Sequence, residues 1–108
     1  MPDFKDQRQS ERFPVNSSST CDFVSPVLED FGPVKIKNIS SLGIGLLMSH
    51  HLQPGLLLAI NLVHKTKAFA KTVLVRVAHV TQEKTGAFLV GCEFKTPLSY
   101  EELSVLVM

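Results

Sequence analysis

Two arginines near the start of the chain provide the first chemistry that the sequence suggests. Arg8 and Arg12 are two of only three arginines, and they stand four positions apart in a polar segment. At that spacing both side chains point the same way, in a helical turn or in an extended strand. A guanidinium offers paired planar donors that suit phosphate oxygens and the O6/N7 edge of guanine. The pair therefore indicates an anionic nucleotide site or, alternatively, a solvated arm whose charge Asp6 and Glu11 balance.

The second candidate lies where one expected strand ends and the next begins. Asn38, Ser40 and Gly43 follow one another there in the pattern Asn-x-Ser-x-x-Gly. Asn and Ser side chains bond either local backbone or a ligand, and Gly permits close backbone approach or a positive φ. Taken alone, the segment fits an ordinary turn held by an Asx or Ser motif just as well.

The elements that would position these residues are short strands. Their apolar positions alternate with polar ones, or form short apolar runs, and Val and Thr are frequent. Turn signals separate them, such as Gln53-Pro54-Gly55. The spacing is typical of an antiparallel barrel or sandwich. We expect strands from near Cys21 and over residues 34–37, 43–48, 56–63, 71–81 and 87–94.

The end of the chain follows a different pattern. Ser99 and Glu102 have the spacing of a capping box, in which the first caps a helix and the second bonds back to it. The sequence therefore predicts a short helix from about Tyr100 to the end. Leu103, with Leu106 or Val107, would pack on the mouth of the sheet.

The chain is long enough for one domain preceded by an arm. Its 108 residues begin with a polar stretch, and residues 16–20 read as a Ser-rich connector. We expect residues 1–18 to be a flexible N-terminal arm carrying Arg8 and Arg12. Residues 19–108 would be the folded domain, with the helix starting at about residue 99.

Composition argues against nucleic-acid binding. Lys and Arg total 11 and Asp and Glu total 10, so the net charge of +1 cannot neutralise a run of phosphates. A barrel for single-stranded nucleic acid needs aromatic side chains on a basic face, and the chain has one Tyr and no Trp. We therefore expect no nucleic-acid partner, whereas a local pair of cations suffices for a small ligand with one or two phosphates.

No pattern typical of catalysis or of metal binding is present in the sequence. There is no nucleophile with a recognisable base, no Gly-rich phosphate loop before a helix and no carboxylate pair. The four His and two Cys include no pair at the spacing of a zinc site. We expect a non-enzymatic protein with neither a metal nor a cofactor.

The same residues indicate a compartment. The N-terminus lacks the apolar stretch of a secretory signal, and the apolar runs are too short to span a bilayer. Cys21 and Cys92 do not make a disulfide framework. We therefore expect a cytoplasmic protein without a membrane span.

Taken together, the order of these features resembles the PilZ domain family. An Arg-x-x-x-Arg arm, a connector, a strand and then Asn-x-Ser-x-x-Gly at a β-turn is the arrangement of that family. Pro54-Gly55 before an apolar strand resembles its G-x-x-l-x-l-x-l segment, and Val90-Gly91-Cys92-Glu93-Phe94 resembles its v-G-v-x-F strand. The resemblance covers most of residues 7–107.

The resemblance implies a fold and a ligand. PilZ domains are six-stranded antiparallel β-barrels, here with a short C-terminal helix, that bind the bacterial second messenger cyclic di-GMP. By that resemblance Arg8 and Arg12 would grip phosphates and guanine Hoogsteen edges from the arm. Asn38 and Ser40 would hydrogen-bond the ligand, chiefly at a guanine, and Gly43 would keep the turn free of a blocking side chain. The arm would close over the ligand and so expose or hide a surface for a downstream protein of unknown identity.

Departures from the family pattern keep an alternative open. Gln7 stands where the family often has a further arginine, Asn38 replaces the commoner Asp, and Cys92 replaces an aliphatic residue. The C-terminus is hydrophobic, and another domain or a second subunit would cover residues 105–108, which makes a homodimer one of the expected assemblies. The alternative is a PilZ-like protein-interaction module that binds no nucleotide.

Overall fold

The computed structural model describes residues 11–25 and 34–108, so Arg8 and Gln7 lie outside the described residues. Six strands and one helix follow in chain order. They are β1 (Ser19–Ser25), β2 (Lys35–Ile39), β3 (Gly43–Met48), β4 (Leu57–His64), β5 (Phe69–Gln82), β6 (Phe88–Phe94) and α2 (Tyr100–Val107).

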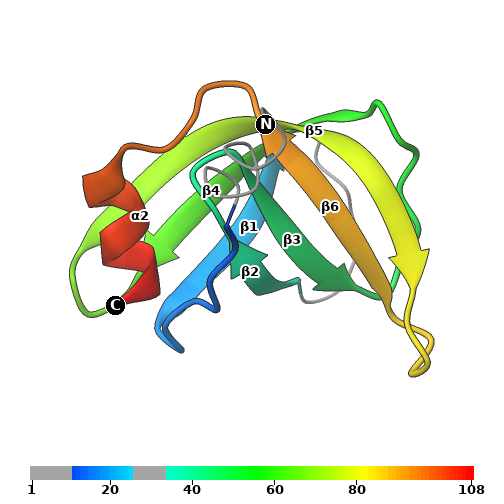
Figure 1. Ribbon diagram of the computed structural model, residues 1–108, viewed down its shortest axis with the longest axis horizontal. Coiled ribbons are helices and arrows are strands. Elements are labelled where there is room, and N and C mark those ends of the chain that lie inside the picture. Colours follow the sequence, from blue (N-terminus) through cyan, green and yellow to red (C-terminus); the bar gives the residue numbers. More distant parts are fainter. Residues whose placement is uncertain (1–10, 26–33) are drawn as a thin grey trace, which may run out of the picture.

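The strands form one antiparallel sheet in the order β1-β4-β5-β6-β3-β2. The sheet curls into a half-barrel, with α2 against one end (Figure 1). β1 and β2 are the two edge strands, and no ladder joins them among the described residues. The prediction of an all-β, six-stranded antiparallel fold with a short C-terminal helix is confirmed, with the barrel left open between its edges.

The inner face of the curl carries the core, and the alternation in the sequence predicts it. In β4 the side chains of Leu58, Ile60 and Leu62 are buried, whereas Leu57 is exposed. β5 behaves in the same way and is 14 residues long, because pairing extends beyond 71–81 at both ends. Successive strand residues face opposite sides, so the positions between these buried ones form the outer face.

The N-terminal segment binds along one sheet edge and then crosses to the helix. Phe13 pairs with Ile39 of β2 through two backbone hydrogen bonds of 2.8 and 2.9 Å. Three residues later, Asn16 donates from its backbone N–H to the carbonyl of Leu106 and from its amide to that of Met108. The segment therefore links the edge of β2 to the last turn of α2.

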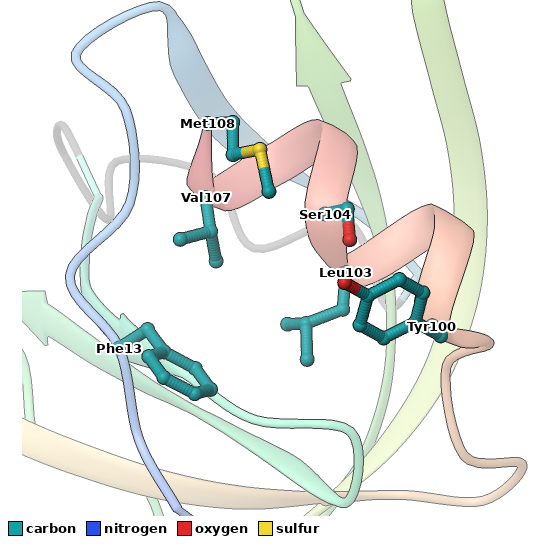
Figure 2. Close-up of a pocket in the computed structure, with 6 residues that line it drawn as sticks. All are labelled: Phe13, Tyr100, Leu103, Ser104, Val107 and Met108. Atoms are coloured by element: carbon teal, nitrogen blue, oxygen red, sulfur yellow. The ribbon is translucent and has the colours of Figure 1, made fainter.

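An apolar cavity of about 210 Å³ lies between this segment and the helix. Figure 2 shows Phe13 on one side of the cavity, with Leu103 and Val107 projecting toward it from α2. Tyr100 and Met108 also line it and are 80% and 69% exposed. The cavity is thus partly open to solvent.

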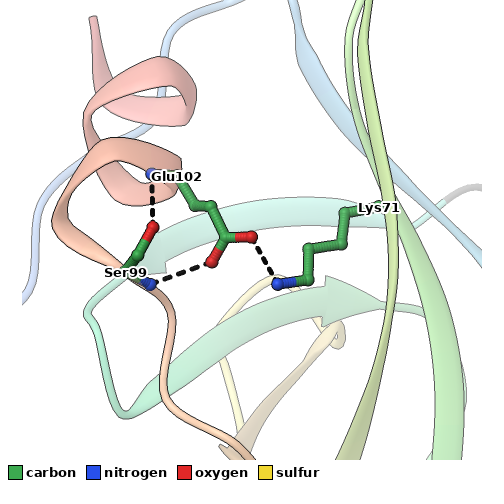
Figure 3. Close-up of polar contacts among 3 residues, drawn as sticks. All are labelled: Lys71, Ser99 and Glu102. Carbon is green, nitrogen blue, oxygen red and sulfur yellow. Dashed lines mark hydrogen bonds and ion pairs between the residues drawn. The ribbon is translucent and has the colours of Figure 1, made fainter.

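The predicted capping box is present and has an additional partner. The Ser99 hydroxyl accepts from the backbone N–H of Glu102, and the Glu102 carboxylate accepts from that of Ser99 (Figure 3). Lys71 of β5 donates to the other oxygen of the same carboxylate. The helix start is therefore attached to the sheet, and Leu106 fixes the next turns because its side chain is fully buried. No helix in the described part of the chain has the length and apolarity needed to cross a membrane.

Candidate functional site

Arg12 and Asn38 come together on the outer face of the sheet. The Arg12 guanidinium donates from Nη1 to Oδ1 of Asn38 at 3.1 Å, across 26 positions of sequence. The antiparallel pairing of Phe13 with Ile39 explains the meeting, because it places Arg12 and Asn38 on the same face as diagonal neighbours, within reach of a long side chain. Among the described residues the Asn38 side chain makes no other hydrogen bond, so its amide Nδ2 is able to donate to a ligand.

Asn38 begins a row of four residues that crosses four strands. It pairs with Gly45 of β3, which pairs with Gly91 of β6, which pairs with His79 of β5. Residues directly opposite one another share a face of the sheet. The row lies on the outer face, because the neighbours of the two glycines along their strands point into the core: Ile44, Leu46, Val90 and Cys92.

Two register shifts of the kind made by a β-bulge place the ends of this row. One extra residue, Lys37, separates Ile36 from Asn38 in β2. A second shift lies between Val77 and His79 in β5. A bulge reverses which residues face outward beyond it, so it directs side chains at sites where regular pairing would not. The structure uses both bulges to turn a polar side chain toward the glycine pair.

The two glycines give the row a backbone floor that the Asn38 and His79 side chains approach closely. A Cβ added to Gly45 would lie 2.7 Å from Oδ1 of Asn38. A Cβ added to Gly91 would lie 2.5 and 2.6 Å from Cε1 and Nε2 of the His79 ring. Such short contacts do not occur between real atoms, so the amide and the imidazole lie close against glycine backbone, and a larger residue at either position would displace them. Both glycines are buried on this otherwise exposed face.

A cavity of about 140 Å³ stands over this floor. It has polar side chains at its two ends and an apolar residue from β6 beside them. The lining residues are Arg12, Asn38, Gly45, His79, Leu89 and Gly91. The cavity is partly open to solvent.

Gly43 lies two residues before Gly45 in β3 and permits a close backbone approach. A Cβ at this position would lie 2.4 Å from the carbonyl oxygen of Cys92 and 3.2 Å from Nη2 of Arg12. The absent side chain thus leaves room both for the β6 backbone and for the guanidinium.

Ser40 is located differently from Asn38. Its hydroxyl is buried, accepts from the backbone N–H groups of Leu42 and Gly43 at 3.2 and 3.1 Å, and lies 3.4 Å from the carbonyl of Gly43. It therefore holds the turn between β2 and β3 and does not line the cavity. Of the two polar residues in the motif, Asn38 is the one that reaches the cavity directly.

Charges on the outer face are arranged around Arg12. Glu93 pairs with Gly43 across the ladder and makes an ion pair of 2.8 Å with Arg76 of β5. The carboxylate beside the site is therefore partly neutralised.

On the inner face, burial raises the pKa of the Cys92 thiol to about 12, although the Arg12 charge acts in the opposite direction.

Of the residues that line the cavity, sequence reasoning named Arg12 and Asn38 as candidate site residues but not the others. Strict alternation along β5 puts His79 on the same face as Val77, so only the register shift reveals it. Glycine inside a strand pattern is a signal of a bulge or a close approach, and Gly45 and Gly91 both carry it. In the described ranges, no three His, Cys, Asp or Glu side chains gather in a way that could hold a metal ion.

Comparison with known proteins identifies a family. Residues 6–108 match the PilZ domain, which is essentially the whole chain. No curated protein and no solved structure matches the chain.

Proposed function

The chain belongs to the PilZ domain family, and from that premise we propose that it is a receptor for cyclic di-GMP. The family is generally a family of cyclic di-GMP receptors, and its domains are binding modules. The proposal for this chain rests above all on the meeting of Arg12 and Asn38, since it joins the two halves of the motif at one cavity.

The chemistry of the cavity supports a guanine nucleotide with phosphates. Arg12 provides a charge-assisted fork for phosphate oxygens or a guanine Hoogsteen edge. Asn38 contributes an amide that both donates and accepts. Arg8 would add the second cation from the arm, so that two guanidinium groups answer the two phosphate charges of the ligand.

The remaining motif residues act in this proposal through the backbone. Ser40 keeps the β2–β3 turn in shape, because its hydroxyl is occupied there. Gly43 leaves the space into which Nη2 of Arg12 extends. The ligand therefore contacts the arm and Asn38, while Ser40 and Gly43 determine where these groups stand.

A switch follows from the position of Arg12 next to Phe13. The next residue, Phe13, pairs with β2 and also lines the apolar cavity at α2. A ligand that reorients Arg12 would therefore act on a segment that contacts both elements. In this proposal the arm closes over the ligand, and the change reaches the exposed helix face that a downstream protein would contact.

Isothermal titration tests the proposal directly. The purified chain is titrated with cyclic di-GMP, and GTP serves as the control ligand. Micromolar or tighter binding that GTP does not reproduce, and that Arg8→Ala and Arg12→Ala weaken at least tenfold, supports the receptor. Absence of heat from a protein shown to be folded would overturn it.

The apolar cavity favours one second candidate, a protein-interaction module that binds no nucleotide. Tyr100 and Met108 are large, exposed and adjacent to that cavity. In this alternative a second copy of the chain covers them. Size-exclusion chromatography with light scattering would then give a dimer that Met108→Glu weakens, and a strictly monomeric protein would count against it.

A further inference from the structure

The cavity over the glycine pair has a wall that the sequence motifs do not account for. Asn38 stands at the β2 end of the row and His79 at the β5 end, with only the backbone of Gly45 and Gly91 between them. Neither ring nitrogen of His79 bonds to a described residue, and the side chain is exposed.

A structural role alone explains part of this arrangement. An aromatic ring that lies over a cross-strand glycine shields its backbone and stabilises the pair. That role requires a ring but requires neither Arg12 nor Asn38 at the other end of the same cavity. The coincidence of the glycine floor, the two register shifts and the motif residues is what points to a ligand.

We infer that His79 is a ligand-contacting residue that closes the β5 side of the site, with its ring against the guanine base. This inference rests on the proposed function, because it assigns a further contact to the same ligand. The base would lie in the cavity against the side chains of Asn38 and His79, which themselves lie close over Gly45 and Gly91. Its polar edge would meet Asn38, and its face or rim would meet the imidazole.

The geometry favours ring contact over charge pairing for His79. The His79 ring lies close against Gly91, with Cε1 and Nε2 nearest to the position of a Cβ there, and it forms the β5 side of the cavity that a planar ligand would contact. Base–aromatic contacts tolerate replacement by another ring but not by a methyl group. The choice of substitution therefore separates the mechanisms.

Titration of three variants with cyclic di-GMP tests the inference. His79→Ala is expected to weaken binding about tenfold, the usual order for removal of one base-stacking ring. His79→Phe is expected to stay within about threefold of the unmodified chain. His50→Ala removes an exposed histidine outside the cavity and is expected to change nothing.

A direct measurement accompanies the affinities. The imidazole Cε1–H resonance of His79, assigned by its loss in His79→Phe, should shift when cyclic di-GMP is added, whereas that of His50 should not. If His79 had a purely structural role, His79→Ala would have a lower thermal stability, and the His79 resonance of the unmodified chain would not shift when cyclic di-GMP is added.

The outcomes separate this inference from the function on which it rests. If the unmodified chain binds and His79→Ala binds equally well, the inference is overturned and the receptor stands. If His79→Phe loses as much affinity as His79→Ala, ring contact is overturned. If the folded, unmodified chain binds no cyclic di-GMP, both the receptor and this contact are overturned.

Discussion

Arg12 and Asn38 lie 26 positions apart in the sequence and are joined by a hydrogen bond of 3.1 Å from Nη1 to Oδ1. The backbone pairing of Phe13 with Ile39 along the edge of β2 brings the two side chains within reach of each other. The N-terminal segment therefore reaches the cavity as an added piece of the sheet, and this gives the guanidinium a defined place before any ligand arrives.

Replacement of Arg12 should affect binding far more than folding. Arg12→Ala removes charge-assisted bonds worth roughly 1.5–3 kcal/mol, so the affinity for cyclic di-GMP should fall at least tenfold. Arg12→Lys should also weaken binding, because an ammonium cannot reproduce the fork. The side chain is exposed, so the free energy of unfolding should stay within about 0.5 kcal/mol of the parent. Calorimetry and chemical denaturation measure the two quantities, and unchanged affinity would reject the site.

Local sequence was sufficient for the elements whose signals are local. The bounds of β3, Gly43–Met48, were predicted because glycine and polar residues flank a short apolar run. The capping box of Ser99 and Glu102 was predicted because both partners lie within one helical turn. The contact of Glu102 with Lys71 was not, since it joins residues 31 positions apart.

Register was the information that the sequence lacked. A shift of one residue moves every following side chain to the other face of a sheet. The shift after Val77 brings His79 outward, and the one after Ile36 places Asn38 opposite Gly45. Motif resemblance located Asn38 without knowledge of the bulge, but no motif marked His79, so the β5 side of the cavity became visible only in the folded chain.

The two cysteines should be inert in the folded protein. Burial raises the pKa of both thiols to about 12, and for Cys21 the nearby Asp22 carboxylate and Cys92 add to this effect. Since the thiolate is the reactive species, a disulfide reagent at pH 8 should label neither Cys21 nor Cys92 in the native state. Both should react promptly in denaturant. Rapid labelling of the native protein would contradict the buried arrangement.

The contact between Lys71 and Glu102 should make stability depend on pH in the acid range. The hydrogen bond from Lys71, followed by that from the Ser99 backbone, holds the pKa of the Glu102 carboxyl below its ordinary value of 4.5. A lowered pKa stabilises the folded state above the unfolded-state pKa, and this contribution disappears as the pH falls through the folded-state value. Denaturation at pH 7 and at pH 3 measures it.

Two variants serve as controls for that pH dependence. Glu102→Gln should be less stable than the parent at pH 7, and the difference should shrink at pH 3. Ser99→Ala removes the cap itself and should cost about 1 kcal/mol. A difference between the parent and Glu102→Gln that is the same at both pH values would show that the carboxylate charge has no role.

Substitution by alanine should mainly reduce stability at Gly43 and mainly reduce ligand affinity at Gly91. In Gly43→Ala the new methyl group meets the backbone carbonyl of Cys92, which cannot move without shifting β6, so about 1–3 kcal/mol of stability should be lost. In Gly91→Ala it meets only the exposed ring of His79, which can rotate away. That variant should stay folded, yet bind cyclic di-GMP more weakly because a methyl group now stands on the cavity floor. Thermal denaturation and calorimetry on both variants distinguish the effects, and a stable Gly43→Ala or a fully binding Gly91→Ala would contradict the geometry of the floor.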